Sequence, residues 1–251
     1  MSPKRNSGQI LLIAAFIMAS LLLSAQLYIL EVGKITSEAE LDSLGNFVLA
    51  SRFGSKHVVI GSLANISNGG QSSVLGLSLE RWSSFIGKQY QFGKSVLNYT
   101  LREQAPYSSG IWIDWSTSGI GISSAYADFT YKLSGQEVDL DQSYFINITT
   151  TVFVESSYQT VSGDVKEVKV TINLFNEAES VLAKQITVYY RLLGSWQIPD
   201  ATNNYVILDC GNGTYIASFV ANIPSQNVEV SAHTVDQRGI HVQANATSTE
   251  I

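Results

Sequence analysis

The sequence predicts an α+β protein with a long N-terminal hydrophobic helix, a short helical region and a β-sandwich body of the immunoglobulin-like type. Three observations support this fold class. An uncharged apolar run covers 21 residues, from Ile10 to Leu30. Apolar residues then recur every three or four positions up to about residue 90, which is typical of helices. From about residue 111 they alternate with polar residues, which is typical of strands with one buried face.

The apolar run Ile10–Leu30 has the length of a transmembrane helix. At about 1.5 Å per residue it reaches about 31 Å, close to the bilayer core of about 30 Å. Lys4 and Arg5 precede the run and Glu31 follows it, so the positive-inside rule places residues 1–8 in the cytoplasm and the remainder outside. A cleaved signal peptide has an apolar stretch of only about 7–15 residues, so we expect this helix to be retained.

The residues before the run, Lys4-Arg5-Asn6-Ser7-Gly8-Gln9, resemble the class III signal of type IV pilin-like proteins, particularly archaeal ones. The resemblance covers about the first 30 residues. It implies that a prepilin-type peptidase cuts between Gly8 and Gln9, and that the apolar helix later packs into a filament core. Ile13 stands where the best-known pilins carry glutamate, a departure that many archaeal members share. Small residues that would allow close helix approach in such a core are Ala14, Ala15, Ala19, Ser20, Ser24 and Ala25.

After Glu31 the pattern becomes amphipathic. Leu41, Leu44 and Val48 lie at helical spacing, so we expect the first helix to continue to about Ala50 or beyond. Asn68-Gly69-Gly70 predicts a turn. A second helix with one buried face is predicted after this turn by the stripe Leu75, Leu79, Trp82 and Ile86.

The strands predicted from the alternating pattern are Ile111–Thr117, Ala125–Leu133, Tyr144–Val154, Asp164–Phe175, Ile186–Leu192, Tyr205–Cys210, Tyr215–Val220, Val228–Val235 and Ile240–Ala246. Their number is close to that of a variable-type immunoglobulin sandwich. The expected organisation is a leader over residues 1–8, a hydrophobic helix and stem over 9–50, a helical region over 51–105 and a β body over 106–251, with a possible sub-boundary near residue 194.

The charge distribution argues against nucleic acid as a partner. Residues 1–102 carry nine Lys/Arg against five Asp/Glu, whereas residues 103–251 carry six against sixteen. The body is therefore acidic, and binding to phosphates needs clustered basic residues. The single cysteine, Cys210, cannot form an internal disulfide, and we expect it to be a small buried residue; an intermolecular pair is the alternative.

Five N-glycosylation motifs follow the apolar run. If the topology is as predicted, all five lie outside the cell, and we expect two or more to carry glycan. Asn147 alternates with Ile146 and Ile148 and should point to solvent, whereas Asn212 lies in a predicted turn. The motif asparagines are Asn65, Asn98, Asn147, Asn212 and Asn245.

The remaining sequence patterns give only weak evidence for a binding or catalytic site. Trp112, Trp115 and Tyr107 could form an aromatic platform for sugars, but the two tryptophans should face opposite sides of one strand. Glu137, Asp139 and Asp141 could contact Ca²⁺, but a solvated turn is the favoured interpretation of these residues. Neither a nucleophile–base pair nor a metal-binding motif is present, so the sequence predicts no enzyme and no cofactor. The scattered histidines are His57, His233 and His241.

Three functions remain as hypotheses. The first is a structural subunit of an extracellular type IV pilus-like filament, a homo-oligomer with its apolar helix in the core and a glycosylated β body outside. The second is a single-pass surface glycoprotein or adhesin that stays in the membrane. The third is a carbohydrate-binding module tethered at the cell surface.

Overall fold

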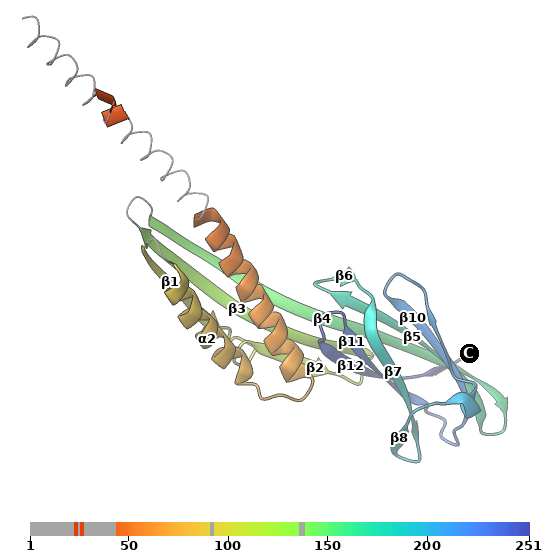
Figure 1. The fold of residues 1–251 in the computed structure, drawn as a ribbon. Coiled ribbons are helices and arrows are strands. Elements are labelled where there is room, and N and C mark those ends of the chain that lie inside the picture. The colour runs from red at the N-terminus through yellow and green to blue at the C-terminus, as the bar shows by residue number, and fades with distance from the viewer. Residues whose placement is uncertain (1–22, 25, 28–43, 91–92, 136–138) are drawn as a thin grey trace, which may run out of the picture. The chain divides into compact units, whose positions relative to one another are not determined.

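The computed structural model describes residues 23–24, 26–27, 44–90, 93–135 and 139–251 (Figure 1). The chain forms two compact units, Met1–Ser51 and Arg52–Ile251. Most of the predicted span Ile10–Leu30, together with the Gly8–Gln9 junction, lies outside the described residues. Within the part of the chain that is described, no helix is both long enough and apolar enough to cross a membrane.

Two helices precede two antiparallel sheets that pack together, so the fold is α+β and sandwich-like. Residues 44–67 are helical, and α2 spans Val74–Gln89. The predicted turn Asn68-Gly69-Gly70 lies between them, with Gly69 at a φ of 95° that glycine adopts readily. Among the described residues, the first helix therefore continues well beyond Ala50.

The two helices meet at Gly54. A Cβ atom at this position would lie 2.1 Å from the ring of Trp82, so only glycine leaves room for the indole. The indole Nε1 of Trp82 donates a hydrogen bond of 2.9 Å to Ser55 Oγ on the same helix as Gly54. The stripe predicted for α2 is confirmed in Leu75, Leu79 and Ile86. The buried apolar residues of the two helices are Val59, Leu63, Ile66, Leu75, Leu79 and Ile86.

The strands form a nine-stranded sheet A and a four-stranded sheet B. In sheet A the order is β1-β3-β4-β5-β10-β9; β2 also pairs with β3, β6 with β5, and β13 with β4. In sheet B the order is β12-β11-β7-β8. The strands of sheet A are β1 Gly93–Leu101, β2 Ile111–Trp115, β3 Ile120–Gly135, β4 Asp139–Ser162, β5 Val165–Asn176, β6 Glu179–Ser180, β9 Val206–Asp209, β10 Thr214–Asn222 and β13 Thr249–Glu250. Those of sheet B are β7 Ala183–Leu192, β8 Ser195–Gln197, β11 Glu229–Asp236 and β12 His241–Thr247.

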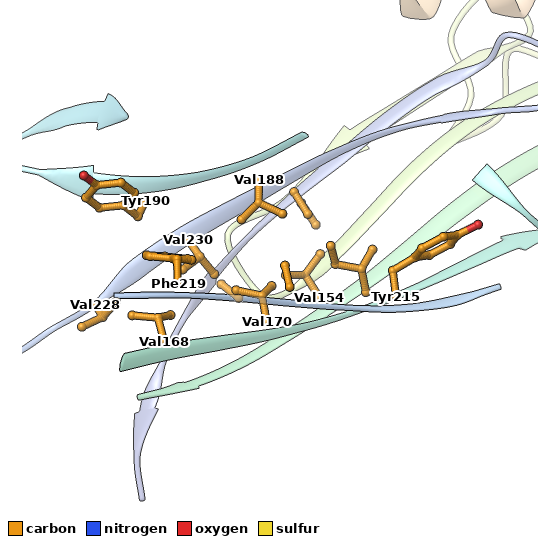
Figure 2. Packing of buried hydrophobic residues seen from close by; sticks show 14 of the residues in the cluster. Val154, Val168, Val170, Val188, Tyr190, Tyr215, Phe219, Val228 and Val230 are labelled. Atoms are coloured by element: carbon orange, nitrogen blue, oxygen red, sulfur yellow. The ribbon is translucent and has the colours of Figure 1, made fainter. Parts of the chain in front are cut away.

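The helices and sheet B both pack on the same face of sheet A, which we call its inner face (Figure 1). Near α2, the hydroxyl of Tyr99 donates to the carbonyl of Gly76 at 3.1 Å. Towards the other end, sheet B covers the face, and the ring of Phe219 in β10 lies 5.2 Å from the ring of Tyr190 in β7 (Figure 2). The strongly alternating strands thus bury one side under helix or sheet. Residues that form the core between the sheets include Val154, Val168, Val170, Ile172, Val188, Phe219, Val230, Val242 and Ala244.

The two sheets come together along β12. A Cβ atom at Gly121 in β3 would lie 2.0 Å from the carbonyl oxygen of Gln243, so glycine permits this close backbone approach. The backbone of Asn245 extends the contact: its N–H donates to Ser116 and its carbonyl accepts from Gly119. One side of the sandwich is therefore closed by hydrogen bonds between backbones.

The predicted strands are confirmed in position, but the two that correspond to β3 and β4 are much longer than expected. The segment Tyr144–Val154 is only the middle of β4, because the two-residue alternation continues through polar residues on both sides. The helical region predicted over residues 51–105 also needs correction, since Gly93–Leu101 form a strand that pairs with β3. Only Ser95 and Leu97 of this strand are buried, so its alternation is easily overlooked next to helical segments.

Candidate functional site

The outer face of sheet A carries a group of rings, which we call the aromatic face: exposed Phe145 and half-buried Tyr107, Trp112 and Tyr126. The rings of Tyr126 and Phe145 are nearly parallel, at an interplanar angle of 7° with centroids 5.7 Å apart. Tyr107 lies 5.8 Å from Tyr126 and 6.0 Å from Trp112, measured between ring centroids. Phe145 is 62% exposed, so most of its ring surface is open to a partner.

Polar groups hold the aromatic face in place. The guanidinium of Arg102 lies over the Tyr126 ring, 4.3 Å from its centroid, which is a cation–π arrangement. The Tyr126 hydroxyl donates to Asp128 Oδ1 at 3.2 Å. Burial raises the pKa of Tyr126, and the carboxylate of Asp128 raises it further. The Tyr126 hydroxyl therefore stays protonated at neutral pH, as its hydrogen bond requires.

Asn147 lies at the edge of the aromatic face. It is exposed, sits directly opposite Tyr126 on the neighbouring strand, and follows Phe145 by two residues. Its Oδ1 accepts hydrogen bonds of 3.2 Å from the hydroxyls of Tyr107 and Ser124. Its Nδ2, the atom that a glycan would modify, makes no hydrogen bond within the described residues. The prediction that Asn147 points to solvent is confirmed.

A shallow groove of about 540 Å³ begins at Asn147 and runs along β4. At its far end the rings of Phe153 and Phe175 stand nearly perpendicular, at 86° with centroids 5.6 Å apart. Glu177 lines the groove and accepts a hydrogen bond from the backbone N–H of Thr149 at 2.9 Å. The groove combines hydroxyls, a carboxylate and aromatic rings, as polar ligands with apolar faces require.

The other four glycosylation motifs differ in exposure. Asn65 is exposed on the first helix, but its motif residue Ser67 is buried and accepts a hydrogen bond from the backbone N–H of His241. Asn98 and Thr100 are both exposed on β1. The remaining two asparagines are Asn212, exposed in a turn, and Asn245, half-buried in β12.

The two tryptophans face opposite sides, as predicted. Trp112 belongs to the aromatic face, whereas Trp115 packs at the edge of the core and its indole N–H donates to Ser123 Oγ at 3.1 Å. Trp115 also lies 5.0 Å from the ring of His241. A platform that joins Tyr107, Trp112 and Trp115 is therefore wrong. Tyr107 and Trp112 are instead joined by Tyr126 and Phe145.

The acidic residues considered for Ca²⁺ lie at the start of β4 rather than in a loop. Asp141 pairs with Lys132 at 2.9 Å, and both side chains are exposed. Asp139 accepts a hydrogen bond of 2.6 Å from Ser134 Oγ. Glu137 lies outside the described residues. Among the residues that are described, no group of three or more His, Cys, Asp or Glu side chains is arranged to hold a metal ion.

Two of the three histidines lie together. His233 in β11 and His241 in β12 are on adjacent strands, with ring centroids 5.5 Å apart. Burial and, to a smaller extent, the neighbouring His241 together lower the pKa of His233 to about 4. Burial also lowers the pKa of His241. Both rings are therefore neutral at pH 7. His57 is separate, with Nδ1 2.8 Å from the carbonyl oxygen of Phe53 on the first helix.

This histidine pair predicts a pH dependence of stability. The pKa of His233 is about 4 in the folded chain against an ordinary value of 6.5, so the unfolded chain binds the proton more readily. The stabilisation is therefore fully present above about pH 6.5 and is lost as the pH falls towards 4. We expect His233→Gln to reduce the difference between urea midpoints measured at pH 7 and pH 4.5. An unchanged difference would contradict the assignment.

Cys210 is exposed, which corrects the expectation that it is buried. It follows β9, the edge strand of sheet A, in which every residue is exposed. The apolar residues Val206, Ile207 and Leu208 predict a buried strand. In the described part of the chain, however, no further strand pairs with the outer side of β9. An apolar strand at a sheet edge is hard to distinguish from a core strand by sequence alone.

Comparison with known proteins adds no family: no protein-family model and no curated protein matches the sequence. The site is therefore defined by geometry alone. Sequence reasoning missed Arg102, Tyr126 and Phe145. The signal that could have found Phe145 is its position two residues before a glycosylation motif in a strand with period two, which places both side chains on one face.

Proposed function

We propose that this chain is a structural subunit of an extracellular type IV pilus-like filament. The observation that carries the proposal is the uncharged run Ile10–Leu30, which directly follows the Gly8–Gln9 junction and basic residues. A helix that is apolar on all sides must be buried in lipid or among copies of itself. In this proposal it does both in turn, first as a membrane anchor and then as part of the filament core.

The β body suits an outer surface. The chain is only 14% charged, and its exposed strand faces carry many hydroxyl and amide groups. Stability comes from packing between sheets, since the single cysteine excludes an internal disulfide. The finer classification as an immunoglobulin-like sandwich belongs to the proposal. So does the location: a cytoplasmic leader, a membrane-inserted precursor, and a glycosylated body at the cell surface that supports adhesion without catalysis.

In this proposal the subunits assemble through contacts between their apolar helices. After a prepilin-type peptidase removes residues 1–8, the helix of one copy packs against the helices of others. Head-to-tail contacts of this kind build a helical polymer when the rotation between copies does not close a ring. Small residues in the run, such as Ala15 and Ala19, allow the helices to approach closely.

N-terminal sequencing of the protein isolated from its source tests this proposal. We expect the first residue to be Gln9 and the chain to be recovered in high-molecular-weight filaments sheared from cells. A chain that starts at Met1 and stays in the membrane fraction would contradict it. That outcome would favour the second candidate, a membrane-anchored surface glycoprotein or adhesin, which the exposed or half-buried asparagines of the five glycosylation motifs also support.

A further inference from the structure

We propose that the glycan attached to Asn147 lies with its first sugar ring against the exposed ring of Phe145. The inference rests on the proposed function, which places the body outside the cell where N-glycosylation occurs. It goes further by choosing one of five motifs and by giving its glycan a defined contact and a stabilising role.

The spacing along β4 brings the two groups together. Phe145 and Asn147 are two residues apart, so their side chains leave the same face of the strand about 7 Å from each other. A sugar ring bound to Nδ2 has about that reach. The C–H groups on one side of a pyranose ring form an apolar face, and aromatic rings present a flat apolar partner of similar size.

The surroundings of Asn147 favour this placement. Its Oδ1 is held by the hydroxyls of Tyr107 and Ser124, which fixes the orientation of the amide group before any glycan is added. Phe145 is 62% exposed, and the ring of Tyr126 on the neighbouring strand stacks against it in a nearly parallel arrangement. Most of the ring therefore remains open, and its stacking on Tyr126 restricts its movement, so little conformational freedom is lost when a sugar packs on it.

No other motif in the sequence offers the same contact. The residues two positions before the five asparagines are Leu63, Val96, Phe145, Cys210 and Gln243. Only Asn147 is preceded by an aromatic residue at this spacing. Tyr99, which follows Asn98, points to the opposite face of β1 and bonds to Gly76. The glycan at Asn147 should therefore be the one that stabilises the fold by packing.

The test compares the melting temperature of the glycosylated full chain before and after removal of its glycans. Mass spectrometry should first show glycan on Asn147. We expect deglycosylation to lower the melting temperature of the natural chain by about 2–4 °C, the shift that a contact of this size gives in a protein of this length. In Asn147→Gln and in Phe145→Ala the shift should be much smaller, because each variant lacks one partner of the contact.

Phe153→Ala is the matched control. Phe153 is an exposed phenylalanine on the same face of β4, but it lies six residues from Asn147. Its removal should leave the effect of deglycosylation unchanged. An unmodified Asn147, or a deglycosylation effect that Phe145→Ala does not reduce, would overturn the proposal. So would binding of free oligosaccharides to unglycosylated Asn147→Gln that is lost on Phe145→Ala, since the face would then recognise a separate carbohydrate. None of these results depends on whether the chain starts at Gln9.

Discussion

Replacing Asp236 with alanine is expected to lower the free energy of unfolding by about 3–5 kcal/mol, the cost of removing one partner from a buried ion pair. The Asp236 side chain is fully buried, and its Oδ2 accepts a hydrogen bond of 2.7 Å from Arg238 Nε. Its Oδ1 accepts from the backbone N–H groups of Arg238 and Ile240, both at 2.9 Å. The substitution therefore also leaves two donors in the turn without partners.

The effect is large because Arg238 connects both sheets. Its guanidinium donates to Glu177, to the carbonyl of Thr149 and to Thr150 Oγ1, all at 2.7–3.1 Å. Thr150 in β4 in turn donates to Asp236 Oδ2 at 3.1 Å. Only 17% of the Arg238 side chain is exposed, so water cannot replace these contacts fully. Loss of Asp236 would disorganise the turn after β11 and its contact with sheet A.

Urea unfolding of the full chain in mild detergent, followed by tryptophan fluorescence, measures this effect. Arg191→Ala is the matched control, because it removes an ion pair with Glu229 at the same 2.7 Å distance whose side chains are 46% and 39% exposed. A surface pair of this kind contributes about 0–1 kcal/mol. Equal losses in the two variants would show that Asp236 is an ordinary surface carboxylate. If Asp236→Ala does not fold, Thr150→Val provides a milder test of the same network.

The sequence does not reveal this network. Asp236-Gln237-Arg238-Gly239 has the composition of a turn, and a local Asp–Arg contact is a reasonable prediction from it. Thr150 and Glu177, however, lie 86 and 61 residues away from Asp236 and Arg238 respectively. Their proximity depends on how β4 and β11 pack across the sandwich. Periodicity reports which face of a strand is buried, but it does not report which strand lies opposite.

Because periodicity reports only the burial of a strand's faces, it predicts some strands of the fold more accurately than others. Alternation located β5, β10 and β12 closely, because half of each strand is strongly apolar. It underestimated β4, whose ends carry Ser and Gln on both faces and are held by pairing with β3 and β5. It also placed β1 in a helical region. Strand β1 lies at the edge of sheet A, where burial is weaker and the pattern is less distinct.

For the candidate site, sequence supplied the motif and structure supplied its neighbours. Asn147 could be placed on the exposed face from its alternation with Ile146 and Ile148. Phe145 could have been added by the same rule. Tyr126 and Arg102 could not, because they reach the site from other segments of the chain. Tyr126 does so through the register between β3 and β4, which sets it opposite Asn147.

Replacing Ala19 with aspartate is expected to abolish filament assembly. Ala19 is near the middle of the uncharged run Ile10–Leu30. An aspartate at the centre of a membrane helix costs about 2.5–3.5 kcal/mol on insertion scales, which a run of this length can tolerate in a single anchor. In a filament core the charge would recur in every copy, close to its neighbours and away from water. Like charges in a low-dielectric environment repel strongly, so the cost accumulates along the polymer.

Two variants separate this effect from a general loss of the protein. Ala19→Ser keeps the small size and should assemble normally, because small polar residues are compatible with close helix packing. Thr117→Asp adds the same charge to an exposed position of the body outside every glycosylation motif and should also assemble. Electron microscopy of sheared material, with membrane fractions probed for the unassembled chain, measures the outcome. Normal filaments from Ala19→Asp would mean that the apolar helix is not buried in a core, and the chain would then be a membrane-anchored glycoprotein.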